Sequence, residues 1–142
     1  MMSENDLIPI DIKKIAITNL TCVVVVGDEE REFPIYIEPG IGAVIKMYIE
    51  GIEKPRPLTH DLIGSILTGL NVEVERVVIN DLRNNTYYAR LFLREENELG
   101  KKIVEIDCRP SDSLAISKMK KCPIFVARKV IDLVGKSESD IF

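Results

Sequence analysis

Hydrophobic and polar residues alternate over residues 10–38 of the chain. The segment "IDIKKIAITNL" alternates roughly, "TCVVVV" is a β-branched apolar run, and "REFPIYIE" resumes the alternation after "GDEE". A period of two is typical of half-buried strands, and a continuous β-branched run is typical of a fully buried strand. The pattern predicts three strands connected as a meander.

A helical period follows this predicted meander. Apolar residues recur at helical spacing through "GIGAVIKMYIEGI", which predicts a helix that packs one face on the sheet. The prolines of "EKPRP" end this helix, because proline lacks the amide donor and disfavours helical geometry in the preceding residue. The apolar set is larger than one sheet face covers, so a homo-oligomer is expected. The residues behind this expectation include Ile41, Val44, Ile49 and Ile52.

A second helix is predicted to begin with Thr59 as its N-cap. Its predicted buried stripe consists of Leu62, Ile63, Ile66, Leu67 and Leu70. Three strands follow, "NVEVERVVIND", "TYYARLFLREE" and "KKIVEIDC", with hairpins at "LRNN" and "NELG". The segments "DSLAISKMKK", "PIFVAR" and "KVIDLVG" then predict a helix, a short strand and a final helix.

The whole pattern predicts a single α+β domain over residues 1–135, followed by a tail over residues 136–142. The sheet is expected to be largely antiparallel, with about six or seven strands, and to carry about three or four helices. No linker divides the chain.

Composition is that of an ordinary globular protein, with 142 residues of which 46% are hydrophobic and 30% charged. No apolar run approaches the roughly 20 residues that span a bilayer, and the first residues lack the apolar segment of a signal peptide. The three cysteines, Cys22, Cys108 and Cys122, show neither CxxC nor zinc-ligand spacing, which indicates reduced thiols. These features predict a cytoplasmic protein without a membrane span.

Charge and motifs narrow the function classes. The formal net charge is −4, so any nucleic-acid contact has to be local, because binding driven by phosphates normally comes with a basic excess. No GxGxxG, GxxxxGK[ST] or GxSxG motif occurs. Dinucleotide-binding, P-loop and α/β-hydrolase chemistry therefore has no support in the sequence.

The only histidine lies in "PRPLTHD", residues 55–61. With Thr59 as the N-cap, His60 and Asp61 fall in the first helical turn, where free amides and the helix dipole favour an anion. Arg56 is close enough in sequence to reach the same place. Two interpretations stay open: a phosphate or carboxylate site with His60 as acid or base, or a capped helix in which Asp61 pairs with Arg56.

A second polar cluster, "EIDCRPSDSLAI", joins a strand to a helix. Asp107 ends the strand and Arg109 turns the corner. Ser111 is the predicted N-cap, and Asp112 lies in the first turn. Two carboxylates across such a corner are able to converge on a hard cation such as Mg²⁺. The alternative is capping alone, in which Asp107 bonds only loop amides.

Four stretches in this order, "FPIYI", "PRPLTHDLI", "NNTYYARLFL" and "EIDCRPSDSLAIS…CPIFVA", resemble the bifunctional nuclease domain family. The resemblance runs from about Phe33 to Val134, and both polar clusters lie in its most specific segments. It implies a nuclease that hydrolyses both DNA and RNA, with nucleic acid as the partner.

The resemblance also implies one site built from both clusters. Its acids would hold a divalent cation, with Mg²⁺ as the first candidate. This cation would stabilise charge on the phosphate and activate water. Its arginines would clamp phosphate oxygens, and its histidine would serve the leaving group. The expected catalytic residues are His60, Asp61, Asp107 and Asp112, of which Asp107 and Asp112 are the expected metal ligands. The expected substrate-binding residues are Arg56, Arg109 and Ser111.

One departure from the family pattern concerns an acid. Family members usually carry Ile-Gly-x-x-Glu after the strand that matches "PIYI". This chain reads "IEPGIGA", with Glu38 at the glycine position and Ile41 at the glutamate position. The alternative function is therefore a non-catalytic module of the same fold that binds an anion, another ligand or a protein partner.

Overall fold

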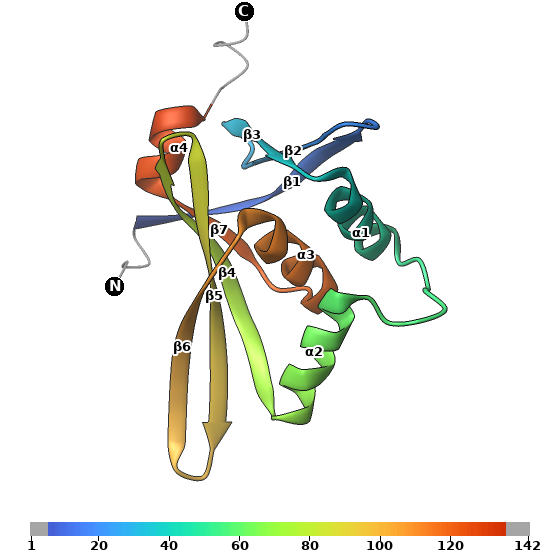
Figure 1. Ribbon diagram of the computed structural model, residues 1–142. Coiled ribbons are helices and arrows are strands. Elements are labelled where there is room, and N and C mark those ends of the chain that lie inside the picture. The colour runs from blue at the N-terminus through green and yellow to red at the C-terminus, as the bar shows by residue number, and fades with distance from the viewer. Residues whose placement is uncertain (1–5, 136–142) are drawn as a thin grey trace, which may run out of the picture.

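The computed structural model describes residues 6–135 (Figure 1), so the tail predicted over residues 136–142 lies outside the described residues. Within the described part, no helix is long and apolar enough to cross a membrane. The elements in chain order are β1 (Leu7–Ile17), β2 (Cys22–Gly27), β3 (Glu32–Ile37), α1 (Pro39–Glu50), α2 (Thr59–Gly69), β4 (Val72–Arg83), β5 (Thr86–Asn97), β6 (Gly100–Cys108), α3 (Pro110–Lys120), β7 (Ile124–Ala127) and α4 (Arg128–Val134).

The seven strands form one sheet in the order β3-β2-β1-β7-β4-β5-β6. Strands β1 to β3 form one antiparallel meander, and strands β4 to β6 form another. The short strand β7 lies between the meanders, antiparallel to β1 and parallel to β4. The sheet is thus mixed and mostly antiparallel, and with four helices the α+β fold predicted from the sequence is confirmed.

All four helices pack into one apolar core with the sheet. Ile45 of α1, Leu114 of α3 and Ile131 of α4 are completely enclosed, together with strand residues such as Val24 and Val77. Burying a side chain of this size contributes about 1.5–3 kcal/mol. Figure 1 shows α3 across the middle of the sheet, near both α1 and α2.

The starts of α2 and α3 correct two predicted caps. The N-cap of α2 is Leu58 and not Thr59. Asp61, in the first turn, caps the start of the helix, because its carboxylate accepts a hydrogen bond from the Leu58 N–H at 2.8 Å. In α3 the predicted cap Ser111 lies inside the helix, after Pro110. Proline suits the first helical position because it has no amide that needs a partner there. A first-turn acid and a proline therefore replace the predicted hydroxyl caps.

The apolar stripe predicted as buried on α2 is only partly buried. Two of its five members, Ile63 and Leu67, pack against the core. The helix approaches α3 through Gly64, where an added Cβ would lie 2.9 Å from the Met119 side chain. Because this small residue faces α3, the outer side of α2 stays at the surface. The outer members of the stripe, each more than half exposed, are Leu62, Ile66 and Leu70.

Gly42→Ala is expected to lower the free energy of unfolding by about 1–3 kcal/mol, the usual cost of overpacking a core. Gly42 is buried on α1, and an added Cβ would lie 2.4 Å from the Cys22 Sγ on β2. Urea unfolding followed by circular dichroism measures the change. The matched control is Gly40→Ala in the same helix, where an added Cβ meets no atom within 4 Å and should stabilise by about 0.4–1 kcal/mol. Equal effects of the two substitutions would contradict this packing.

Candidate active site

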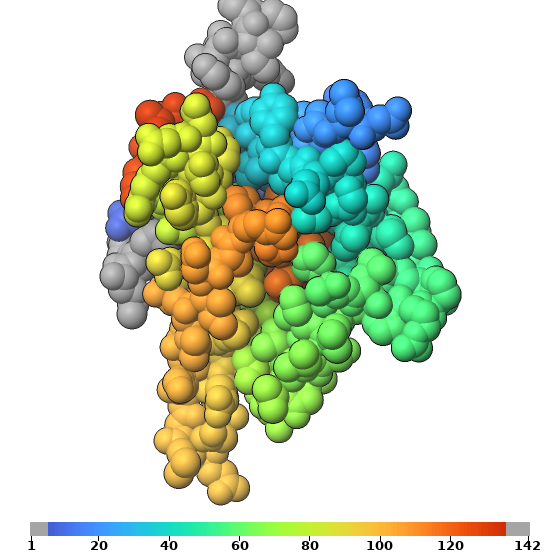
Figure 2. Space-filling model, in the orientation of Figure 1, coloured from blue at the N-terminus to red at the C-terminus, as the bar shows by residue number. Residues whose placement is uncertain are grey.

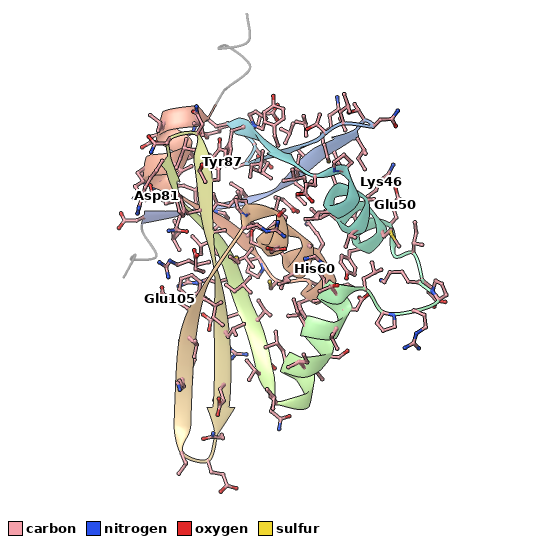
Figure 3. All side chains as sticks on the ribbon, in the orientation of Figure 1. Lys46, Glu50, His60, Asp81, Tyr87 and Glu105 are labelled. Carbon is pink, nitrogen blue, oxygen red and sulfur yellow. The ribbon has the colours of Figure 1, made fainter. Side chains whose placement is uncertain are left out.

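Two helix starts that are far apart in the sequence meet in space. His60, in the first turn of α2, places its Nε2 3.1 Å from the Oδ1 of Asp112, in the first turn of α3. Figure 3 shows His60 at the end of α2 that lies near α3. The two side chains are 12% and 25% exposed. This contact joins the two polar clusters that the sequence singled out.

Arg109 completes the arrangement from the residue before α3. Its Nε donates to the Oδ2 of Asp112 at 3.0 Å, and its Nη2 donates to Oδ1 at 3.3 Å. The Arg109 side chain is 64% exposed, and a guanidinium has further N–H donors beyond these two. His60, Asp112 and Arg109 are called the His60 cluster below.

Electrostatics keep Asp112 ionised. Burial alone raises the pKa of this carboxyl, but the hydrogen bonds from Arg109 and His60, with the Arg109 charge, outweigh burial and hold the pKa below the ordinary 3.8. The same carboxylate raises the pKa of Arg109. An ionised carboxylate only accepts hydrogen bonds, so the His60 Nε2 carries the proton in this contact. The other ring nitrogen, Nδ1, is then the one left to exchange a proton with a ligand.

Asp61 turns away from this cluster toward a second group of residues. Its carboxylate accepts hydrogen bonds from the Leu58 N–H at 2.8 Å and from the Tyr48 Oη at 3.0 Å, and lies 3.5 Å from the Lys54 Nζ. Burial by itself raises the pKa of Asp61, but these contacts outweigh burial and lower it. Asp61 thus ties the loop before α2 to the helix. Lys54 takes the part that the capping interpretation gave to Arg56.

The strand register directs Asp107 to the other face of the sheet. Asp107 is paired with Arg90, and Arg90 with Val78. Val78 belongs to a small apolar cluster separate from the main core, because its neighbours along β4 face the helices. The next residue, Cys108, packs against the main core, and its burial, with nearby carboxylates, raises the pKa of its thiol to about 12. Alternation along β6 therefore separates Asp107 from the His60 cluster.

Two other expected site residues lie outside the His60 cluster. Arg56 is exposed in the segment between α1 and α2, and Ser111 is buried in the first turn of α3. Within residues 6–135, no hydrogen bond or ion pair joins either residue to His60 or Asp112. The structure thus brings together three of the seven residues expected from the sequence.

A divalent ion needs several oxygen ligands at one point. Both oxygens of Asp112 already accept hydrogen bonds from His60 and Arg109, while Asp107 points to the other face. Among the described residues, no group of three or more His, Cys, Asp or Glu is placed to hold a metal. The residues in this arrangement do not fit the expected Mg²⁺ site, and the metal requirement stays a prediction for experiment.

A groove of about 560 Å³ opens beside Arg109. Its walls come from the turn between β1 and β2, the end of β3, the start of α1, the turn between β4 and β5, and the start of α3. Ile41, at the family's glutamate position, lines it together with Glu38, so this departure falls next to the His60 cluster. Two aromatic rings also line it: Tyr36, which is exposed, and Tyr87, which stacks on Phe33 at 5.7 Å between ring centroids.

Three residues near the site, Tyr36, Tyr48 and Lys54, are not among the site residues predicted from the sequence. Tyr36 carries a usable signal, because a large aromatic residue occupies an outward position of an alternating strand in "PIYI". Tyr48 and Lys54 carry none, since their contact with Asp61 depends on the path of the loop between α1 and α2.

The contribution of Asp112 to stability is expected to fall with pH. Folding lowers the pKa of this carboxyl, so its stabilisation is present above the ordinary value of 3.8 and is lost as the pH falls through the folded-state value. The difference in free energy of unfolding between wild type and Asp112→Asn should therefore be larger at about pH 6 than at about pH 2.5. Urea unfolding at both pH values measures it. A difference that does not change with pH would contradict the ion-paired state.

Comparison with known proteins shows which protein family this chain matches. The model of the bifunctional nuclease domain matches residues 23–139, which include both polar clusters. Uncharacterized proteins from two strains of Mycobacterium tuberculosis are 36% identical over 106 residues, covering 75% of this chain and 60% of theirs. Bifunctional nuclease 1 of Oryza sativa subsp. indica is 26% identical over 98 residues, covering 68% of this chain and 29% of the rice protein. The chain thus spans 60% of the length of its mycobacterial relatives.

Proposed function

We propose that this chain, which belongs to the bifunctional nuclease domain family, hydrolyses phosphodiester bonds of DNA and RNA at the His60 cluster. The observation that carries the proposal is the contact of 3.1 Å between His60 and Asp112, with Arg109 bound to the same carboxylate. The names of the rice proteins, bifunctional nuclease, support the same reaction class.

Arg109 binds the phosphate in this proposal. Its exposed guanidinium has N–H groups that do not face Asp112, and these bond the phosphate oxygens. Negative charge grows on those oxygens during attack at phosphorus, so the same donors stabilise the transition state more than the ground state. Asp112 holds the guanidinium in place through two hydrogen bonds.

His60 transfers the proton. Water, or the 2′-hydroxyl in RNA, attacks phosphorus and gives its proton to solvent water, and the bond from phosphorus to the leaving oxygen breaks. The leaving oxygen takes a proton from the His60 Nδ1, and Asp112 stabilises the imidazolium through Nε2. A histidine suits this step because its imidazole can both donate and accept a proton.

The groove beside Arg109 accommodates the nucleic-acid strand. Tyr36 offers an exposed ring on which a base can stack, and stacking tolerates any base. The phosphate contacts are confined to this place, which is compatible with a chain whose formal net charge is −4. This local binding favours single-stranded substrates, whose bases are free to stack.

A reducing compartment, the cytoplasm, is the proposed location. Cys22, Cys108 and Cys122 are all free thiols. Burial raises the pKa of each of the three. Thiols that remain protonated react slowly with oxidants, which fits structural cysteines.

Substitution of the His60 cluster is expected to lower cleavage of single-stranded DNA and RNA oligonucleotides by about a hundredfold or more. The variants are His60→Ala, Asp112→Asn and Arg109→Ala, measured after repurification. The control is Lys46→Ala, which removes an exposed cation paired with Glu50 on α1 and should leave the rate unchanged. Figure 3 shows Lys46 and Glu50 on α1, away from His60.

Equal rates in wild type and a folded Asp112→Asn variant would assign the activity to a contaminating nuclease. The non-catalytic module would then be favoured. In that case fluorescence anisotropy of a labelled oligonucleotide should still depend on Arg109.

Asp107→Ala separates the His60 mechanism from the metal hypothesis. Because Asp107 lies on the other face of the sheet, we expect this variant to keep its activity, and we expect cleavage to continue in EDTA. The metal hypothesis expects a loss of about a hundredfold in Asp107→Ala, and loss in EDTA that Mg²⁺ restores. That second outcome would overturn proton transfer by His60 without a metal.

A further inference from the structure

Strand β6 forms one edge of the sheet, with β5 as its partner on one side. Its residues from Gly100 to Asp107 are exposed. Figures 1 and 2 show the β5–β6 hairpin extending beyond the helices. Three apolar side chains of this strand, Ile103, Val104 and Ile106, are 43%, 36% and 42% exposed. An edge strand with free backbone groups and apolar side chains is a template for another strand.

The opposite edge of the sheet is protected in a way that β6 is not. That edge is β3, which carries the exposed Pro34 near its middle. Proline has no amide to donate to a further strand. Strand β6 has no proline. Of the two edges, β6 is therefore the one suited to accept a strand.

We propose that β6 pairs antiparallel with β6 of a second copy of this chain, about a two-fold axis at Val104. The charges of the strand are divided between its halves, with Lys101 and Lys102 before the axis and Glu105 and Asp107 after it. An antiparallel pair sets the basic half of each copy against the acidic half of the other. A parallel pair would set like charges together, which destabilises.

The side chains on both faces of β6 determine where the two-fold axis lies. With the axis at Val104, Lys101 of one copy is opposite Asp107 of the other. On the face toward the helices, Val104 and Ile106 of both copies form one apolar patch beside the buried leucines of β5. The pairing thus brings the two Val104 side chains together on the face toward the helices, where each Ile106 lies opposite Lys102. On the other face it joins Lys101 to Asp107, and Ile103 lies opposite Glu105.

Among residues 6–135, the lysines of β6 form no ion pair. Register places Lys101 opposite Glu96, and Lys102 opposite Glu95, on β5. No ion pair joins these residues across the hairpin in the part of the chain that the structure describes. Lys101 therefore remains available to Asp107 of a second copy. The homo-oligomer expected from the sequence thereby acquires a defined interface, distinct from the apolar face of α1 that suggested it.

Sedimentation velocity tests the interface. Wild type should sediment as a dimer, and Val104→Lys should raise the dimer dissociation constant at least about tenfold, because two ammonium groups would meet at the axis. Leu99→Lys at the exposed hairpin tip is the control and should remain dimeric. Circular dichroism confirms that both variants fold. A wild-type monomer, or a dimer that Val104→Lys does not weaken, would overturn the proposal.

Disulfide trapping tests the register in a Cys108→Ser, Cys122→Ser background. Directly opposite residues of antiparallel strands have Cα atoms about 4.5–5.5 Å apart, which is within reach of a disulfide. Val104→Cys should therefore link to itself under mild oxidation. Lys102→Cys and Ile106→Cys should each fail to link alone and should link when mixed. Linkage at Val104→Cys that is no faster than at Leu99→Cys would reject the two-fold axis.

Discussion

The enclosure of α3 is the constraint on which the other features depend. From Ser113 to Ser117 this helix is buried between the sheet and its neighbours. Two of its buried serines have hydrogen-bond partners: the Ser113 Oγ donates to the Pro110 carbonyl at 2.7 Å and the Ser117 Oγ to the Cys122 carbonyl at 2.6 Å. At its far end the Lys120 Nζ donates to the Gly64 carbonyl of α2 at 3.1 Å. A helix held on all sides keeps its first turn, and so Asp112, in one place.

Asp112 connects this core to the chemistry at the surface. One carboxylate receives an imidazole from α2 and a guanidinium from the corner before α3. The attraction between Asp112 and Arg109 offsets the cost of partly burying the Asp112 carboxylate. The first turn of each helix supplies additional positive potential. Positive groups are thus concentrated at one point of a protein whose formal net charge is negative. Polar preorganisation of this kind requires rigid supports, which the packed helices provide.

The periodicity of the sequence was sufficient for the strands, the helices and the fold class, because each element has a face that must be buried. It was not sufficient for side chains whose partners come from irregular segments. Asp61 bonds Tyr48 and Lys54 rather than Arg56, since the loop path decides which residues reach it. The outer apolar stripe of α2 was predicted as buried, because a helical wheel does not show that Gly64 faces α3. The meeting of His60 and Asp112, 52 residues apart, follows from tertiary packing alone.

The position of β7 between the two meanders affects how the chain folds during synthesis. Strand β1 pairs with β7, whose last residue is Ala127. Until the ribosome has released that segment, the two meanders are separate sheets, and β1 and β4 each have an uncovered edge. Closing this contact brings together parts of the chain that are far apart, which is slow compared with hairpin formation. The nascent chain is therefore most exposed to strand exchange and aggregation just before β7 emerges.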